Sequence, residues 1–137
     1  MSTVLKKELL KNYVDNIDIL KDRYSLKLPD SYLDIVKNVL ECMVLDNEYG
    51  YPDIKKIHEI DDGDYQGTLV FIVPEKAYQP STYWYIRVYY GSCSGCDELQ
   101  AIVDYNYEKP NEQQINDIMA LSLHVAQNLK QMDDNLD

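Results

Sequence analysis

The residues Thr82 to Gln100, TYWYIRVYYGSCSGCDELQ, are the part of the sequence from which the fold is best deduced. Their first part, 82–90, is rich in aromatic and β-branched residues and is predicted to be a strand. Successive side chains of a strand point to opposite faces, so this one divides into two sets. One set consists of Tyr83, Tyr85, Arg87 and Tyr89, and the other of Trp84, Ile86, Val88 and Tyr90.

The tyrosine-rich set has a functional and a structural interpretation. Aromatic platforms on sheets stack nucleic-acid bases, and tyrosine and arginine are enriched where proteins bind one another. Tyrosine is also simply a good strand residue on a half-buried face. Because the chain is acidic and Arg87 is the only basic residue of the strand, we favour the structural interpretation over base stacking. Among functional uses, we favour a protein interface.

The segment after the strand, 91–97, is predicted to be a tight turn that leads into a short helix. Gly91 and Gly95 permit backbone conformations that other residues resist, and cysteines fill small buried spaces. Asp97, with Gln100 three residues later, resembles a capping box that opens a brief helix. We therefore interpret the turn as structural.

Zinc and redox chemistry are alternative interpretations of the same turn. Cys93 and Cys96 have the spacing of half a zinc site. The remaining candidate ligands are isolated in the sequence: Cys42, His58 and His124. A Cys-x-x-Cys pair before a helix also suits redox chemistry, because a helix N-terminus lowers the pKa of a thiol. The acidic residues 97 and 98 would oppose thiolate formation here.

A third chemical interpretation is a nucleophile elbow, because Gly91-x-Cys93-x-Gly95 has the spacing of that motif. Asp104 and His124 follow in the order of a catalytic triad. The elbow normally belongs to a large parallel sheet, however, and the strands expected here are short and antiparallel. This architecture argues against the motif.

Two more strands are expected before the tyrosine-rich one, over residues 54–60 and 65–73. The residues between them, Asp61 to Asp64, form a short Asp/Gly connection of the kind that hairpins use. A longer loop bounded by Pro74 and Pro80 leads to the strand at 82–90. Consecutive strands are usually neighbours, so the three should form an antiparallel meander.

Helices are expected on both sides of these strands. Apolar residues recur at three- and four-residue spacing in three segments. These run from Thr3 to Tyr24, from about Ser31 to about Asn47, and from Asn111 to Met132. Asp30 or Ser31 should cap the second of these helices. The sequence thus predicts one α+β domain over residues 1–137, in which two N-terminal helices and one long C-terminal helix pack on a small three-stranded sheet.

Charge is unevenly distributed along the chain. Residues 1–56 hold 9 basic and 10 acidic residues, a balance of −1, whereas residues 57–137 hold 4 and 14, a balance of −10. An anionic surface repels phosphate backbones, so direct nucleic-acid binding is not expected. A basic partner protein fits better, as does a protein that imitates the charge of nucleic acid, although the charge also serves simple solubility.

Composition predicts a cytoplasmic protein that does not enter a membrane. No apolar run approaches the roughly 18 residues of a membrane span. Charged residues interrupt the leucines of residues 1–13, where a secretory signal would need an unbroken apolar region. Three cysteines without an export signal indicate reduced thiols. We expect no cofactor and no bound metal.

The segments Asp64 to Gly67 and Tyr90 to Gln100 resemble a pattern in uncharacterised small proteins of bacteriophages and their bacterial hosts. The similarity covers roughly residues 57–104. It implies a phage or mobile-element origin and implies no catalytic residue. It also implies that the turn at Asp64 and the cysteine turn belong to one unit, which a meander could bring together.

Two functional hypotheses follow from the sequence. The first is a non-enzymatic, phage-encoded acidic protein that binds a basic host protein, as an inhibitor or as a charge mimic of nucleic acid. The alternative is a small thiol-dependent enzyme or metal-binding protein centred on the cysteine turn. The candidate binding residues are Asp64, Tyr65, Tyr83, Tyr85, Arg87, Tyr89, Cys93, Cys96 and Asp97.

Overall fold

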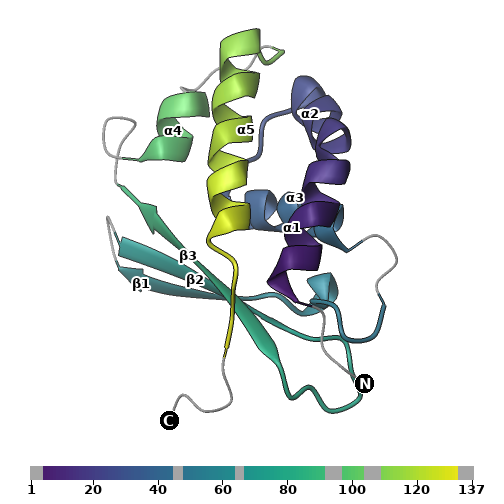
Figure 1. Cartoon of the computed structure of the whole chain (residues 1–137). Coiled ribbons are helices and arrows are strands. Elements are labelled where there is room, and N and C mark those ends of the chain that lie inside the picture. The colour runs from purple at the N-terminus through teal and green to yellow at the C-terminus, as the bar shows by residue number, and fades with distance from the viewer. Residues whose placement is uncertain (1–4, 45–47, 64–66, 92–96, 104–108, 133–137) are drawn as a thin grey trace.

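A computed structural model of the chain describes residues 5–44, 48–63, 67–91, 97–103 and 109–132. These residues form an α+β fold in which the helices lie on one side of an antiparallel sheet (Figure 1). The α-helices are α1 (Lys6–Asp15), α2 (Ile17–Leu26), α3 (Tyr32–Met43), α4 (Glu98–Val103) and α5 (Glu112–Gln127). The strands are β1 (His58–Gly63), β2 (Gly67–Pro74), β3 (Tyr83–Tyr90) and β4 (Lys130–Gln131), and a 3₁₀ helix covers Ile54–Lys56.

The expected meander is present as β1-β2-β3, but the described sheet has a fourth strand that the sequence did not predict. Its order is β1-β2-β3-β4, and every neighbouring pair is antiparallel. The prediction of one helix from Asn111 to Met132 is wrong at its end, because α5 stops at Gln127 and the chain turns at Asn128. Leu129 is fully buried as expected, but it lies between a helix and a strand.

The prediction of one helix from Thr3 to Tyr24 is also wrong, because the chain breaks at Asn16 between α1 and α2. Two asparagine side chains account for the break. Asn16 Nδ2 donates to the carbonyl of Cys42 at 3.2 Å, and Asn12 Nδ2 donates to that of Met43 at 3.0 Å. They satisfy carbonyls at the end of α3 that have no partner within their own helix.

Other boundaries shift by a few residues for local reasons. Residues 54–56 are a 3₁₀ helix rather than the start of a strand, and Asp53 accepts the N–H of Lys55 at 3.1 Å. Asp61 to Gly63 belong to β1 rather than to a turn. Helix α3, which corresponds to the second predicted helix, ends at Met43, before the expected Asn47. Its predicted cap is confirmed, because Ser31 Oγ accepts the N–H of Asp34 at 3.2 Å.

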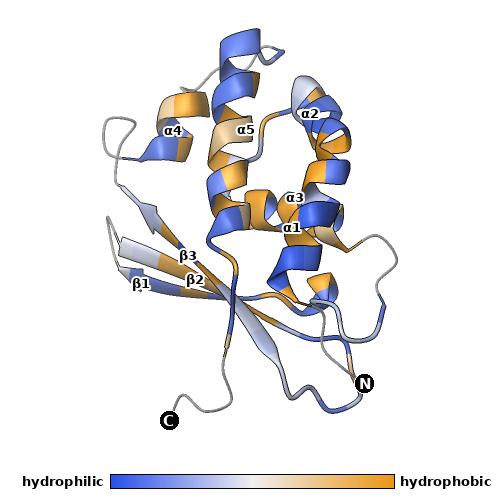
Figure 2. Cartoon of the chain, in the orientation of Figure 1, coloured by the Kyte–Doolittle hydropathy of each residue, from blue (hydrophilic) through white to orange (hydrophobic). Residues whose placement is uncertain are grey.

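The core lies between the helices and one face of the sheet. Helix α3 is the most buried helix, with seven of its twelve residues inside, and it contacts α1, α2 and α5. Phe71 and Val73 of β2 meet one of the two predicted sets of β3, of which Trp84, Ile86 and Val88 are buried. Figure 2 shows hydrophobic residues along the middle of β2 and on α3, at the centre of the molecule.

The hairpin between β1 and β2 requires glycine at residue 67. A Cβ atom there would lie 2.6 Å from the carbonyl oxygen of Asp62 and 2.9 Å from the Cα of Gly63. Both contacts are with backbone, so one strand must move. We expect Gly67→Ala to lower the free energy of unfolding by about 2 kcal/mol, measured by urea denaturation. Thr68→Ala, the next residue of the strand, should cost less than about 1 kcal/mol, and equal stability of the two variants would contradict this prediction.

Candidate functional site

The sheet has one face that the helices do not cover, which we call the open face. By the register of the strands, this face carries alternate residues of β1, β2 and β3. Its members are His58, Ile60, Asp62, Thr68, Val70, Ile72, Pro74, Tyr83, Tyr85, Arg87 and Tyr89. The predicted tyrosine-rich set of β3 therefore lies together on this face.

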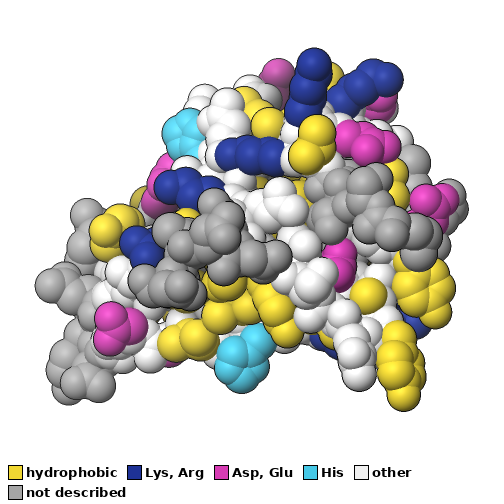
Figure 3. Space-filling model, turned by 60° about the horizontal axis from the view of Figure 1, so that its bottom comes forward, with side chains coloured by type: hydrophobic (Ala, Val, Ile, Leu, Met, Phe, Trp, Pro, Cys, Tyr) yellow, Lys and Arg dark blue, Asp and Glu magenta, His cyan; other side chains and the backbone are white. Residues whose placement is uncertain are grey.

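Several apolar and aromatic side chains of the open face are exposed. Tyr89 is 82% exposed, Ile60 41% and Tyr83 39%. The guanidinium carbon of Arg87 lies 5.9 Å from the centre of the Tyr85 ring, within the range of a cation–π interaction. Figure 3 brings this side of the molecule forward and shows hydrophobic side chains gathered next to a histidine. Such groups contribute large contact areas when a partner covers them.

Asp97, also predicted as a binding residue, is 4% exposed and serves the fold. Its carboxylate accepts three hydrogen bonds: from Tyr32 Oη at 2.7 Å, from the N–H of Gly91 at 2.8 Å and from the N–H of Gln100 at 3.1 Å. The last bond confirms Asp97 as the cap of α4. The Gln100 side chain, in contrast, donates to the carbonyl of Gly91 at 3.1 Å, so it does not complete the expected capping box.

Tyr32 is the tertiary link in this cluster. Its hydroxyl donates to Asp97 and accepts the N–H of Leu99 at 3.1 Å. Burial raises the pKa of this hydroxyl, and the neighbouring Asp97 raises it further, whereas the bond from Leu99 opposes the shift. The neutral hydroxyl therefore remains a hydrogen-bond donor, and it joins α3 to the start of α4 across 65 residues of sequence.

Four candidate residues, Asp64, Tyr65, Cys93 and Cys96, lie outside the described residues, so the structure tests none of the interpretations of the cysteine turn. Described residues that flank them are close together, because Gly67 of β2 pairs with Tyr90 of β3. Asp104, the proposed triad member, also lies outside the described part.

The remaining candidate ligands are well separated. Cys42 is a buried free thiol in α3, and its Sγ lies 3.8 Å from the carbonyl of Asn16 as a weak donor. Burial raises the pKa of this thiol. His58 is exposed on β1 and His124 is exposed on α5. Within the described ranges, no three histidine, cysteine or acidic residues are grouped as a metal site requires.

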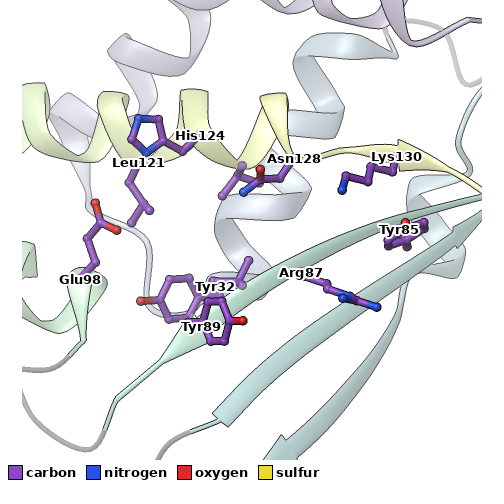
Figure 4. A pocket seen from close by; sticks show the side chains of 11 residues that line it. Tyr32, Tyr85, Arg87, Tyr89, Glu98, Leu121, His124, Asn128 and Lys130 are labelled. Atoms are coloured by element: carbon purple, nitrogen blue, oxygen red, sulfur yellow. The ribbon is translucent and has the colours of Figure 1, made fainter.

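Two hollows lie beside the end of β3. One, of about 320 Å³, is bordered by acidic residues from three elements, with Asp30 before α3, Glu59 and Asp61 on β1, and Asp97 before α4. Tyr90 Oη donates to Asp61 at 2.6 Å along its edge. The other, of about 350 Å³, lies between β3 and α5 (Figure 4). Sequence reasoning missed this second hollow, because its walls come from five helices and strands that only the tertiary fold brings together.

Comparison of the chain with protein-family models, with curated proteins and with solved structures finds no match. Among the described residues, no helix combines the length and the apolar character needed to cross a membrane.

Proposed function

We propose that the protein is a non-enzymatic interaction protein that binds a basic partner protein through the open face of its sheet. The observation that carries this proposal is the exposure of Ile60, Tyr83 and Tyr89 together on that face. Ile60 on β1 and the two tyrosines on β3 lie on either side of β2, whose open-face residues are half-buried and connect them. Aromatic residues dominate the energetics of many interfaces.

The charge of the neighbouring edge supports a basic partner. Strand β1 carries Glu59, Asp61 and Asp62, all exposed. The open face itself also carries a cation, Arg87, so the acidic character predicted for residues 57–137 belongs more to its rim than to its centre. Charged residues at the rim of an interface steer association, and salt weakens this electrostatic attraction. The resemblance to phage proteins would place such a partner in a bacterial host.

Substitutions on the open face test this proposal. We expect the double variant Ile60→Thr/Tyr83→Thr to lower partner affinity at least about tenfold, because two exposed apolar contacts of the interface are lost while threonine preserves strand propensity. The measurement is quantitative recovery of bound protein from host lysate at low salt and at about 0.5 M salt, followed by titration with the recovered partner.

A control of matched chemistry substitutes residues that are more exposed but lie off the sheet. Tyr78, in the loop before β3, is 95% exposed, and Val14 of α1 is 61% exposed. Tyr78→Thr/Val14→Thr should bind as wild type does. Equal loss in both double variants, or no recovered protein at either salt, would refute the proposal.

The alternative of a thiol-dependent enzyme or metal-binding protein centred on Cys93 and Cys96 stays a prediction. Asp97 does not favour it, because its carboxylate is already engaged by three donors. Rapid alkylation of one of these two thiols in the folded protein would favour it.

A further inference from the structure

The outer edge of β3 is only partly covered. Strand β4 pairs with Trp84 and Tyr85, and within the described sheet no strand pairs with the remainder of that edge. The N–H of Met132 donates to the carbonyl of Tyr83 at 2.7 Å, so the main-chain groups of Tyr83 point toward β4. These groups alternate in direction along a strand. Those of Arg87 and Tyr89 therefore point toward the same edge, beyond the end of β4.

The 350 Å³ hollow lies along this open part of the edge, and we call it the edge groove. Its sides are β3 at Arg87 to Tyr89 and α5 at Leu121 to Val125, with Asn128 just after the helix. Val88, Leu121 and Val125 supply an apolar floor. Its volume falls within the range of ligand sites in proteins. A groove between a strand edge and a helix can accept an extended peptide, which gains main-chain hydrogen bonds from the strand.

The two ends of the edge groove differ in charge. Arg87, Asn128 and Lys130 lie toward β4, whereas Glu98 lies at the opposite end (Figure 4). The Lys130 side chain extends toward Asn128 in this view. The groove thus offers two cations and an amide at one end and a carboxylate at the other.

Strand β4 also limits how a peptide can lie there. A peptide added to this edge as a strand would lie in line with β4. It must stop at Asn128 and Leu129, which lead from α5 into β4, so the peptide has to end there. An antiparallel peptide would place its C-terminal carboxylate beside Lys130. A parallel peptide would place its N-terminal ammonium beside Lys130 and Arg87, which repel it.

We propose that the edge groove binds the free C-terminus of an extended peptide, antiparallel to β3. The last residue of the peptide pairs with Arg87, and the third-last residue pairs with Tyr89, so both use outward main-chain groups. The penultimate residue lies opposite Val88, and its side chain enters the apolar floor. The fourth-last residue lies nearest Glu98, which favours a basic side chain. This site shares Arg87 and Tyr89 with the open face, but its apolar floor lies on the helix side of β3, and neither Ile60 nor Tyr83 lines it.

The test uses pools of acetylated hexapeptides, randomised at the last four positions, prepared as free acids and as carboxamides. Immobilised protein should retain the free-acid pool at least about tenfold better than the carboxamide pool, because only the acid carries the charge that Lys130 and Arg87 attract. The retained sequences should be enriched in an apolar penultimate residue. Equal retention of the two pools, or retention of neither, would overturn the proposal.

Two protein variants locate the binding. Lys130→Glu should reduce binding of a selected free-acid peptide about tenfold, whereas Lys109→Glu, at an exposed lysine outside the groove, should leave it unchanged. In amide NMR spectra the peptide should shift the signals of Arg87 and Tyr89 more than those of His58 and Ile60. The opposite pattern would overturn the groove as the site. The variant Ile60→Thr/Tyr83→Thr changes no residue that lines the groove. It should therefore bind the peptide as the wild type does, even if the open-face proposal fails, so the two proposals are tested separately.

Discussion

Asp97→Ala should lower the free energy of unfolding by about 3 kcal/mol, the largest effect that we expect from a single substitution outside the apolar core. The change removes the acceptor of three hydrogen bonds. Two of the donors, Tyr32 Oη and the N–H of Gly91, then lose this acceptor although they are buried. Hydrogen bonds to a charged group are worth about 1.5–3 kcal/mol each, and stranded buried donors add to the loss. Urea denaturation measures the change, and a fall in Tm of about 10 °C should accompany it.

The neighbouring acidic residue provides the matched control for Asp97. Glu98 is the next residue in the chain and is exposed, so Glu98→Ala should change stability by no more than about 0.5 kcal/mol. Tyr32→Phe removes only one of the three donors to Asp97, and its effect should overlap with that of Asp97→Ala in a double-mutant cycle. If Asp97→Ala is as stable as Glu98→Ala, then the cluster does not join β3, α3 and α4 as described.

The second large effect is loss of stability in alkaline solution. Tyr13, Tyr24 and Tyr32 are buried, and burial is the main cause that raises the pKa of each hydroxyl above its ordinary value of 10.0. In the unfolded chain these groups release their protons near pH 10, while in the folded chain they retain them. Stability is therefore complete below pH 10 and falls as pH rises above it.

The size of this alkaline effect follows from linkage. Each tyrosine that stays protonated in the folded state removes about 1.4 kcal/mol from the free energy of unfolding by pH 11. Tyr13 offers a sharp test, because its hydroxyl has no hydrogen-bond partner among the described residues. Tyr13→Phe should leave the free energy of unfolding unchanged at pH 7. Above pH 10 the free energy of unfolding should fall less steeply with pH in this variant, because one fewer group releases a proton on unfolding. The measurement is urea denaturation between pH 7 and 11.

A control for the alkaline experiment is Tyr78→Phe, at a position that is 95% exposed. This variant should show the pH dependence of the wild type. If Tyr13→Phe and Tyr78→Phe have the same slope, burial of Tyr13 does not contribute to the alkaline loss of stability.

Local patterns predicted much of the helix and strand content. Alternation along 83–90 separated the buried Trp84 and Ile86 from the exposed Tyr83 and Tyr89, because a strand has a period of two and one face of this sheet is covered. The beginning of α5 was also predictable: Asn111 accepts the N–H of Gln114 at 2.7 Å, a bond between residues three apart. Signals of this kind need no information from distant parts of the chain.

Periodicity misled where tertiary contacts compete with it. The apolar stripe of residues 3–24 continues from Tyr13 in α1 to Leu20 in α2, so the sequence shows no break at Asn16. The break depends on carbonyls of α3, more than 25 residues away. Strand β4 has only two residues, too few for any strand pattern, and it exists because Lys130 and Gln131 pair with β3.

The candidate sites divide in the same way. Alternation within one strand is enough to predict which side chains of β3 share a face. Three further features depend on the packing of distant segments: this face is left open, Asp97 is buried and bonded to Tyr32, and β3, α5 and β4 enclose a groove. These features arise from contacts between residues far apart in sequence, and the periodicity of one segment shows which of its faces is buried but not which distant segment covers that face.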